Sequence, residues 1–306
     1  MKRVRFHKWM MAVVLTSGIA AATGSASAAE TKGKTFASPE EAFRALVAAA
    51  GDSKAVLAIL GPEARPIVDS GDSASDKADR ERFLKSYRET SKLMKSGDDM
   101  VLLVVGKDEW IFPIPVVKEA AGWRFDTREG KEEVLNRRIG RNELSVIQAV
   151  KAYVDAQREY YLRNPQNDKL LQYAQRFVST QGKRDGLYFP VKEGERASPL
   201  GPLFDRVQTV GKGEARKRVP YHGYYYRILK AQGPDAPGGA YNYTAQGRLI
   251  GGHALIAWPA SYRNSGVMTF IINHEGVVYE KDLGRDTAAA AQKITRFNPD
   301  KTWKRF

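Results

Sequence analysis

Histidine is the side chain that most often moves protons near neutral pH, and this chain of 306 residues has four of them. Three of the four, His222, His253 and His274, lie in the C-terminal half and are widely separated in sequence. Histidine metal sites usually place two ligands at positions i and i+4, or within one short loop. None of the three has such a partner, so the sequence predicts no metal centre and no bound cofactor.

The sequence also lacks the usual motifs of nucleophilic catalysis. It contains no cysteine, which excludes thiolate chemistry, disulfides and zinc ribbons. Gly-x-Ser-x-Gly does not occur, and Ser265, between Asn264 and Gly266, is typical of a turn. The glycine-rich stretch 233–239 has no predicted helix after it, so it lacks the helix N-terminus with which nucleotide-binding loops hold phosphate. We interpret it as an exposed loop.

One catalytic hypothesis stays open, that of a cofactor-free hydrolase. Its acid and base groups would come from polar residues beside the aromatic and glycine-rich segments of the C-terminal half, namely Tyr221, His222, Asp185 and Asp282. Acid-base catalysis requires such groups to converge on one substrate. The hypothesis therefore depends on whether these side chains meet in one deep pocket, and it fails if they are scattered.

A binding hypothesis rests on a basic loop and the tyrosine-rich segment that follows it. Residues two apart in a strand share a sheet face, so Tyr224 and Tyr226 could present their rings to a ligand, while nearby cations could collect anions. The alternative is that the tyrosines pack in the core and the basic run is solvated. The candidate binding residues are Lys212, Arg216, Lys217, Arg218, Tyr224 and Tyr226.

Charge is distributed unevenly along the chain, whose formal net charge is +14. Residues 29–140 hold 19 Lys and Arg against 20 Asp and Glu, a net charge of −1, whereas residues 141–306 hold 26 against 15, a net charge of +11. Such a shift favours a domain boundary, which we place near Gly140. A domain of this charge suits an anionic envelope polymer, an anionic lipid or another envelope protein. Nucleic acid is not expected as a partner outside the cytoplasm.

The first 28 residues have the pattern of an export signal. Basic residues at positions 2, 3, 5 and 8 precede a short apolar run at 9–22, and Ala26-Ser27-Ala28 is a small-residue cleavage motif. We expect cleavage after Ala28, which leaves no transmembrane anchor because no second apolar run of about 18 residues follows. The mature protein is therefore predicted to be periplasmic or secreted.

The elements of the N-terminal half, residues 29–140, are predicted to be helices followed by a small sheet. Ser38-Pro39-Glu40-Glu41 predicts a helix start, Gly61-Pro62 ends a second helix, and a third helix carries Phe83 and Met94 toward Gly97. Strands are predicted at 100–105, 110–117 and 123–125, with prolines at 113 and 115 that cannot donate to a neighbouring strand. This α+β arrangement suggests a cystatin-like or nuclear-transport-factor-like cone.

The C-terminal half, residues 141–306, is predicted to be α+β as well. A long helix over 143–163, capped at Asn142, has a wide apolar face that begins at Leu144. Strands are predicted at 221–229, 253–258, 267–273 and 277–281, the last two joined by a turn at 273–276, and a closing helix at 287–295. The long helix should pack on the antiparallel sheet.

Six segments carry a family resemblance. They are Trp-Ile-Phe-Pro-Ile-Pro at 110–115, Arg-Arg-Ile-Gly-Arg-Asn-Glu-Leu at 137–144, Asp-Gly-Leu-Tyr-Phe-Pro at 185–190, Tyr-His-Gly-Tyr-Tyr-Tyr-Arg-Ile at 221–228, and the segments 233–241 and 264–270. Together they resemble a bacterial family catalogued as Domain of Unknown Function 2950, over nearly the whole mature chain. This resemblance implies no activity, cofactor or catalytic residue.

A more distant similarity concerns the C-terminal half alone. The order of long helix, Gly-Tyr-Tyr-Tyr-Arg strand, Ala-Trp-Pro strand and closing hairpin resembles the globular part of type II secretion pseudopilins. Pseudopilins carry a glycine-type processing site followed directly by an apolar helix, and Ala26-Ser27-Ala28 followed by a polar stretch differs from that pattern. We therefore expect an exported α+β protein of two domains that acts by binding at the cell envelope, with the hydrolase as the alternative.

Overall fold

The computed structural model describes residues 33–201 and 219–306, all of which belong to one compact unit. Helices and antiparallel sheets occur in separate runs along the chain, which is the α+β class that the sequence predicts. In the described part of the chain, no helix is both long enough and apolar enough to cross a membrane.

Helices come first in the N-terminal half. They are α1 (Pro39–Ala49), α2 (Ser53–Leu60), the short 3-10 helix η1 (Pro62–Ala64), α3 (Arg65–Val68) and α4 (Ser73–Glu89). The predicted start of α1 is confirmed, since the Glu41 backbone N–H donates to Ser38 Oγ at 3.2 Å and Pro39 takes the first helical position. The predicted end of α2 is confirmed as well, because Gly61 caps it with a φ of +88°.

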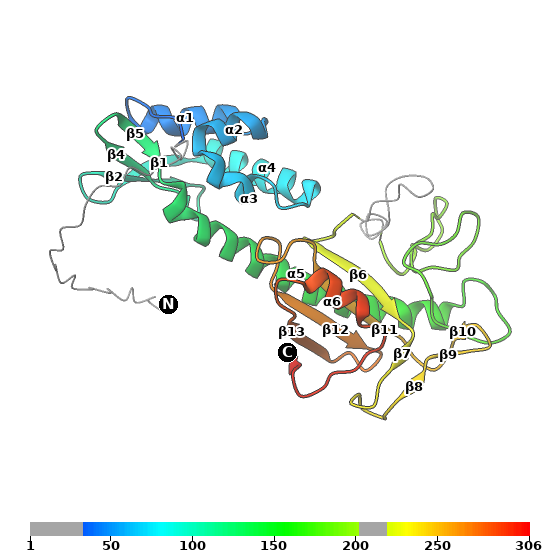
Figure 1. Ribbon diagram of the computed structural model, residues 1–306. Helices are drawn as coiled ribbons and strands as arrows, with labels where there is room; N and C mark the ends of the chain where they lie inside the picture. The colour runs from blue at the N-terminus through cyan, green and yellow to red at the C-terminus, as the bar shows by residue number, and fades with distance from the viewer. Residues whose placement is uncertain (1–32, 202–218) are drawn as a thin grey trace, which may run out of the picture. The chain divides into compact units, whose positions relative to one another are not determined.

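The sheet of the N-terminal half has five antiparallel strands in the order β1-β2-β4-β5, with β3 also paired to β2. Its strands are β1 (Ser91–Lys95), β2 (Met100–Val105), β3 (Trp110–Ile111), β4 (Val116–Glu119) and β5 (Gly122–Phe125). In the core beneath it, Phe43 of α1 packs edge-on against Phe125 with ring centroids 5.3 Å apart. Figure 1 shows α1 to α4 gathered beside these strands.

Two predictions for this region are wrong. The third helix does not continue to Gly97: α4 ends at Glu89, and Met94 lies in β1, where Ser91 to Lys95 pair with Val105 to Val101 of β2. Strand pairing, a tertiary contact, outweighs the local helical spacing there. The single strand expected at 110–117 is divided into β3 and β4, because Pro113 and Pro115 interrupt pairing between them.

The long helix, α5 (Thr127–Arg163), begins earlier than predicted. Its N-cap is Asp126, whose Oδ1 accepts from the Glu129 backbone N–H at 3.3 Å, and the predicted cap Asn142 lies in the helix interior. Asn142 is buried, and its Nδ2 donates to the carbonyl of Ser265 at 2.8 Å. The prediction of Asn142 as the cap is therefore wrong, because its side-chain amide donates to a residue distant in sequence and not to a backbone group at a helix end.

Because α5 runs without a break through Gly140, the expected boundary lies inside a helix. Side chains near its start, such as Val134, pack with the N-terminal core, and side chains from Val146 onward pack with the C-terminal core. The two apolar cores are thus distinct while sharing one helix. That residues 29–140 and 141–306 fold as separate domains stays a prediction.

The main sheet of the C-terminal half is antiparallel with the order β14-β13-β12-β11-β6. The remaining elements are β6 (Tyr224–Leu229), β7 (Ala231–Gln232), β8 (Tyr241–Asn242), β9 (Thr244–Ala245), β10 (Arg248–Leu249), β11 (Ala254–Pro259), β12 (Met268–Asn273), β13 (Val278–Asp282), α6 (Thr287–Lys293) and β14 (Lys304–Arg305). The four predicted strands and the closing helix match β6, β11, β12, β13 and α6 to within three residues. The predicted turn is confirmed, since the Gly276 backbone N–H donates to the Asn273 carbonyl at 2.9 Å.

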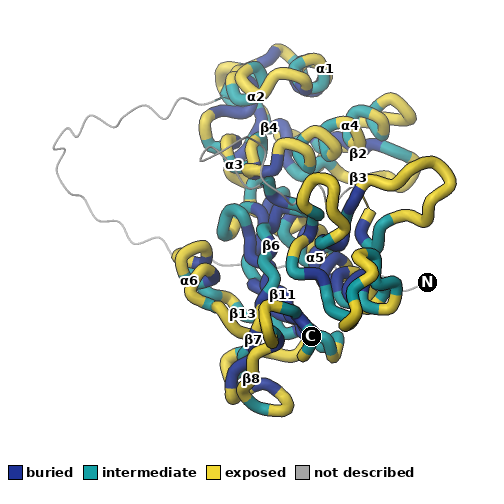
Figure 2. The backbone as a smooth tube through the Cα atoms, turned by 90° about the vertical axis from the view of Figure 1, so that its right-hand side faces the viewer, coloured by how far each residue is buried: buried dark blue, intermediate teal, exposed yellow. Residues whose placement is uncertain are grey.

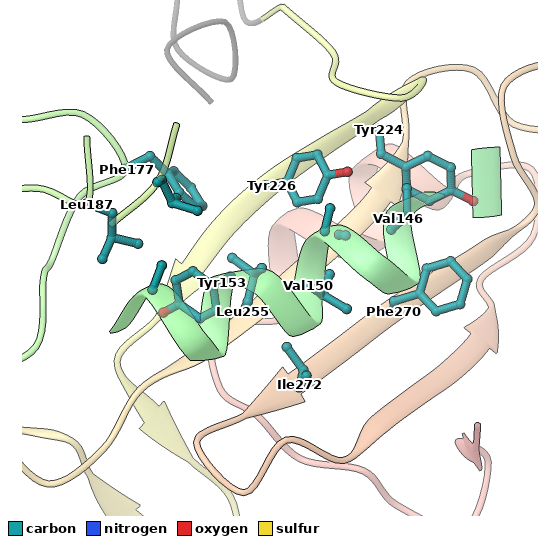
Figure 3. Close-up of a cluster of buried hydrophobic side chains, with 14 of the residues drawn as sticks. Val146, Val150, Tyr153, Phe177, Leu187, Tyr224, Tyr226, Leu255, Phe270 and Ile272 are labelled. Atoms are coloured by element: carbon teal, nitrogen blue, oxygen red, sulfur yellow. The ribbon is translucent and has the colours of Figure 1, made fainter. Parts of the chain in front are cut away.

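The apolar face of α5 packs on this sheet, as the sequence predicts. Figure 3 shows Val146, Val150 and Tyr153 of α5 among side chains of the sheet such as Leu255 and Ile272. β11 lies between β12 and β6 and is buried along its whole length (Figure 2). Leu144, expected on the apolar face, is instead 63% exposed.

Candidate functional site

A cavity of about 460 Å³ lies in the N-terminal half, between the helices and the sheet. Its floor is apolar and comes from several elements, with Leu46 of α1, Val56 and Leu60 of α2, Val105 of β2 and Ile114 after β3. A cavity of this size and lining is typical of small-molecule sites.

Charged side chains from two helices, α4 and α5, line this cavity because their spacing along each helix places them on one face. On α4, positions 76, 79, 80 and 83 carry Asp, Asp, Arg and Phe, and on α5, positions 134, 137, 138 and 141 carry Val and three Arg. Spacings of three and four residues place side chains on one face of a helix. α5 can approach the 113–114 segment because Gly130 has no side chain, since a Cβ there would lie 2.6 Å from Ile114 Cα. The charged walls and the apolar floor thus belong to the same space.

Aromatic rings line one side of the cavity. The ring of Phe83 lies 5.4 Å from that of Phe112 and 6.4 Å from that of Trp110, and the Trp110 and Phe112 rings are 6.1 Å apart. Trp110 is 42% exposed, and the Arg137 guanidinium lies 5.5 Å from its ring centroid. This side of the cavity therefore offers polarisable apolar surface that solvent can reach.

Arg138 is the most deeply buried charge in the cavity wall, with 7% of its surface exposed. Its Nη1 donates to the Pro66 carbonyl and to Asn264 Oδ1, both at 2.6 Å, and its Nη2 donates to the Ile67 carbonyl. Burial lowers the pKa of Arg138, while the charges of Asp76 and Asp79 raise it. Arg138 thus joins α5, the end of α3 and the turn before β12.

The two aspartates of α4 are held by different partners. Asp79 accepts from Arg141 at 2.6 Å and from Arg82. Asp76 accepts from Ser70 Oγ at 2.7 Å and from the Ser70 backbone N–H at 3.0 Å, and burial nevertheless raises the pKa of Asp76. Both carboxylates therefore have partners from the protein itself.

The residues of the hydrolase hypothesis have different partners. Tyr221 and His222 lie side by side, with ring centroids 4.1 Å apart, and burial lowers the pKa of His222 although Asp72 opposes it. Asp185 accepts from the backbone N–H and Oγ1 of Thr180 at 2.7 and 2.8 Å. Asp282, at the end of β13, accepts from Tyr262 Oη and the Gly284 backbone N–H. The cavity is lined by none of the four.

The candidate binding residues divide into two groups. Tyr224 and Tyr226 are 0% and 6% exposed and pack in the core against α5 (Figure 3). Tyr224 Oη donates to the Met268 carbonyl at 2.9 Å and Tyr226 Oη to the Tyr221 carbonyl at 3.1 Å. The two tyrosines lie on the same face of the strand, as predicted. That face packs in the core, so neither ring is accessible to a ligand at the surface. The basic loop with Lys212, Arg216, Lys217 and Arg218 lies outside the described residues.

A family model described as "Protein of unknown function (DUF2950)" matches residues 33–306. The chain belongs to this DUF2950 family. The resemblance seen in the sequence motifs is thereby confirmed. No curated protein and no solved structure matches the chain. The similarity to pseudopilins and the likeness to a cystatin-like or nuclear-transport-factor-like cone therefore stay predictions.

Two histidines of this DUF2950 protein lie near each other in the C-terminal half. The rings of His253 and His274 are 6.1 Å apart, and His253 packs against Tyr153 at 5.3 Å and Tyr173 at 4.8 Å. His253 is 2% exposed, and burial, aided by His274, lowers its pKa to about 3. Across residues 33–201 and 219–306, no three His, Cys, Asp or Glu side chains are placed to hold a metal ion.

The cavity of this DUF2950 protein was not predicted from the sequence, nor was a role in it for Arg80, Arg137, Arg138 or Trp110. The signal was present as arginines at 137, 138 and 141, whose spacing of three and four residues marks one helix face. This signal was not recognised because the helix was expected to begin at residue 143. Helical spacing has no meaning for residues that are expected to lie outside a helix.

Proposed function

We propose that this DUF2950 protein is an exported binding protein that takes an extended apolar small molecule into the cavity of its N-terminal half. The observation that carries the proposal is the apolar cavity of about 460 Å³ with an exposed aromatic side. Apolar ligands gain free energy when such walls remove their surface from water.

Binding is favoured over hydrolysis by the state of the polar groups. Two of the three cavity carboxylates are already partnered, since Asp76 accepts from Ser70 and Asp79 pairs with Arg82 and Arg141, and the third, Asp108, is exposed. A general base needs a carboxylate that can reach the substrate proton. None of the four residues of the hydrolase hypothesis lines the cavity.

Export and an envelope location belong to this proposal too, and they rest on the sequence of residues 1–28. N-terminal sequencing of the exported protein tests them, with Ala29 as the expected first residue. A mature protein that still begins at Met1 would contradict cleavage.

The cavity should bind linear alcohols with an affinity that rises with chain length. Each buried methylene contributes about 0.8 kcal/mol, so each added pair of methylenes should tighten Kd roughly tenfold until the cavity is full. Displacement of the neutral fluorescent probe N-phenyl-1-naphthylamine by octanol, decanol and dodecanol measures this series in the full mature chain.

A matched pair of variants locates the binding. Val56→Trp adds an indole to the cavity floor and should weaken dodecanol binding at least about tenfold, because the ring removes space for several methylenes. Val191→Trp adds the same ring at a position that is 38% exposed and outside the cavity, and it should change nothing. Equal affinities in the two variants, or no dependence on chain length, would rule out the cavity as the site.

A second proposal concerns the C-terminal half, whose net charge of +11 suits an anionic envelope polymer or lipid. Near α6 and the C-terminus, Lys281, Lys293 and Arg296 line one concave surface together with Asp286 and Asp300, which gives this lining a formal charge of +1. Co-sedimentation with anionic vesicles or cell-wall polymer across a salt series tests it. Binding that does not weaken as salt rises would contradict it.

A further inference from the structure

We infer that the ligand of the N-terminal cavity is an anionic amphiphile, with one apolar tail and an oxyanion head group that Arg80 recognises. This inference rests on the proposed function and adds the chemical class of the ligand. It follows from how the charges that line the cavity are partnered.

The cavity lining holds more positive than negative charge. Five arginines line it, against three aspartates, so the formal charge of the lining is +2. The arginines are Arg80, Arg82, Arg137, Arg138 and Arg141, and the aspartates are Asp76, Asp79 and Asp108. An excess of positive charge beside low-dielectric walls attracts an anion.

Four of the five arginines are already occupied. Arg82 and Arg141 share Asp79, Arg137 pairs with Glu133 at 2.7 Å and donates to the Ile111 carbonyl, and Arg138 serves two carbonyls and Asn264. Because the donors of these four guanidinium groups already bind groups of the protein, we assign them to the structure of the cavity wall and not to ligand recognition.

Arg80 is the exception. It lines the cavity and is half-buried, yet it makes no hydrogen bond or ion pair with any residue in 33–201 or 219–306. None of the three aspartates of the lining pairs with it: Asp79 is shared by two other arginines, Asp76 is held by Ser70, and Asp108 forms no ion pair with it. A guanidinium offers paired N–H donors that match carboxylate and phosphate oxygens. A cation left unpaired at the edge of an apolar cavity is what an amphiphile with an anionic head requires.

The tail and the head have separate places in this arrangement. Arg80 lies one turn before Phe83 on the same face of α4, and Phe83 begins the aromatic side formed with Phe112 and Trp110. A head group held by Arg80 would therefore place a linear tail along these rings and over the apolar floor. Neutral apolar molecules could use the floor but not Arg80.

The test compares ligands that share one tail. Dodecanoate and dodecyl phosphate carry an anionic head and dodecanol a neutral one, and each competes with N-phenyl-1-naphthylamine below its micelle concentration in the full mature chain. We expect both anions to bind about tenfold tighter than dodecanol, with an advantage that shrinks as salt rises. The tighter of the two anions identifies the head group.

Two variants on α4 connect the effect to Arg80. Arg80→Gln should remove the advantage of the anions and leave dodecanol binding unchanged, which also reports that the fold is intact. Arg88→Gln, on the same helix but exposed and outside the cavity, should behave like the unchanged protein. Arg80→Lys keeps the charge and should retain part of the advantage if Arg80→Gln proves poorly folded.

The outcomes separate the two levels of the proposal. If dodecanol binds as tightly as the anions, the head-group inference is overturned and the proposed function stands. If the anions are favoured equally in Arg80→Gln, Arg80 is not the recognition residue. If none of the three ligands binds, the proposed function falls and the inference falls with it.

Discussion

Replacing Arg138 by methionine should lower the free energy of unfolding by about 3 to 5 kcal/mol, because the change removes one buried partner of an ionic and hydrogen-bonded network. The variant leaves the Pro66 and Ile67 carbonyls and Asn264 Oδ1 without their donor. It also leaves Asp76 and Asp79 without a buried positive charge nearby. Methionine fills much of the volume of the arginine stem, so the loss reports the guanidinium and not a large void.

The neighbouring residue provides the control for Arg138. Arg137→Met removes a guanidinium whose side chain is 39% exposed, and it should cost less than about 1 kcal/mol. Arg138→Lys keeps the charge but cannot reach all three acceptors, so an intermediate loss is expected. Urea denaturation followed by circular dichroism measures all three variants. Equal stabilities of Arg138→Met and Arg137→Met would show that the buried network does not hold α5 to α3.

Acidification should destabilise the folded protein through His253. The unfolded histidine has its ordinary pKa of 6.5, whereas burial lowers the folded pKa to about 3. Protons therefore bind preferentially to the unfolded state between these two values, and stability that is fully present above 6.5 is lost as the pH falls toward 3. At about pH 5 the loss from this group should be about 2 kcal/mol, and near pH 3 it should be about 4 kcal/mol.

His253→Phe tests this pH dependence. The phenyl ring keeps the edge-to-face packing against Tyr153 and Tyr173 and replaces His253 Nδ1, which is buried without a hydrogen-bond partner. We expect the variant to lose less stability than the unchanged protein between about pH 8 and pH 5, by about 2 kcal/mol. Urea midpoints at both pH values give the comparison. If the two proteins lose the same stability on acidification, His253 does not carry the effect.

Elements whose signals are local could be predicted from the sequence. Ser38 and Pro39 mark the start of α1 through their own side-chain chemistry, and the Asn273–Gly276 turn sets the pairing of β12 with β13. Alternating and apolar runs predicted β6 and β11. These patterns succeed because a strand that packs in the core needs apolar residues at its buried positions. The α+β class followed from these elements.

Elements defined by distant contacts could not be predicted in this way. Met94 fits a helical face by spacing, but its strand pairs with β2, and Asn142 has the chemistry of a cap but donates to Ser265. The cavity is a stronger case, since Arg80 and Arg138 lie on different helices and meet the same space only through tertiary packing. Tyr224 shows the opposite error, because alternation identified its face but not which side of the sheet the core occupies.

The continuity of α5 also sets the angular relation between its two sets of contacts. Val134 and Arg138 face the cavity side, while Val146 and Val150 face the C-terminal sheet, and the helix turns by about 100° per residue between them. Inserting or deleting a single residue in that interval would rotate one set by about this angle and move it about 1.5 Å along the axis, breaking the bridge from Arg138 to Asn264. Only insertions or deletions close to a whole number of helical turns would keep the two sets of side chains in their present relative orientation. The number of residues between Arg138 and Val146 is therefore itself a determinant of the cavity, even where the side chains in that interval touch nothing in it.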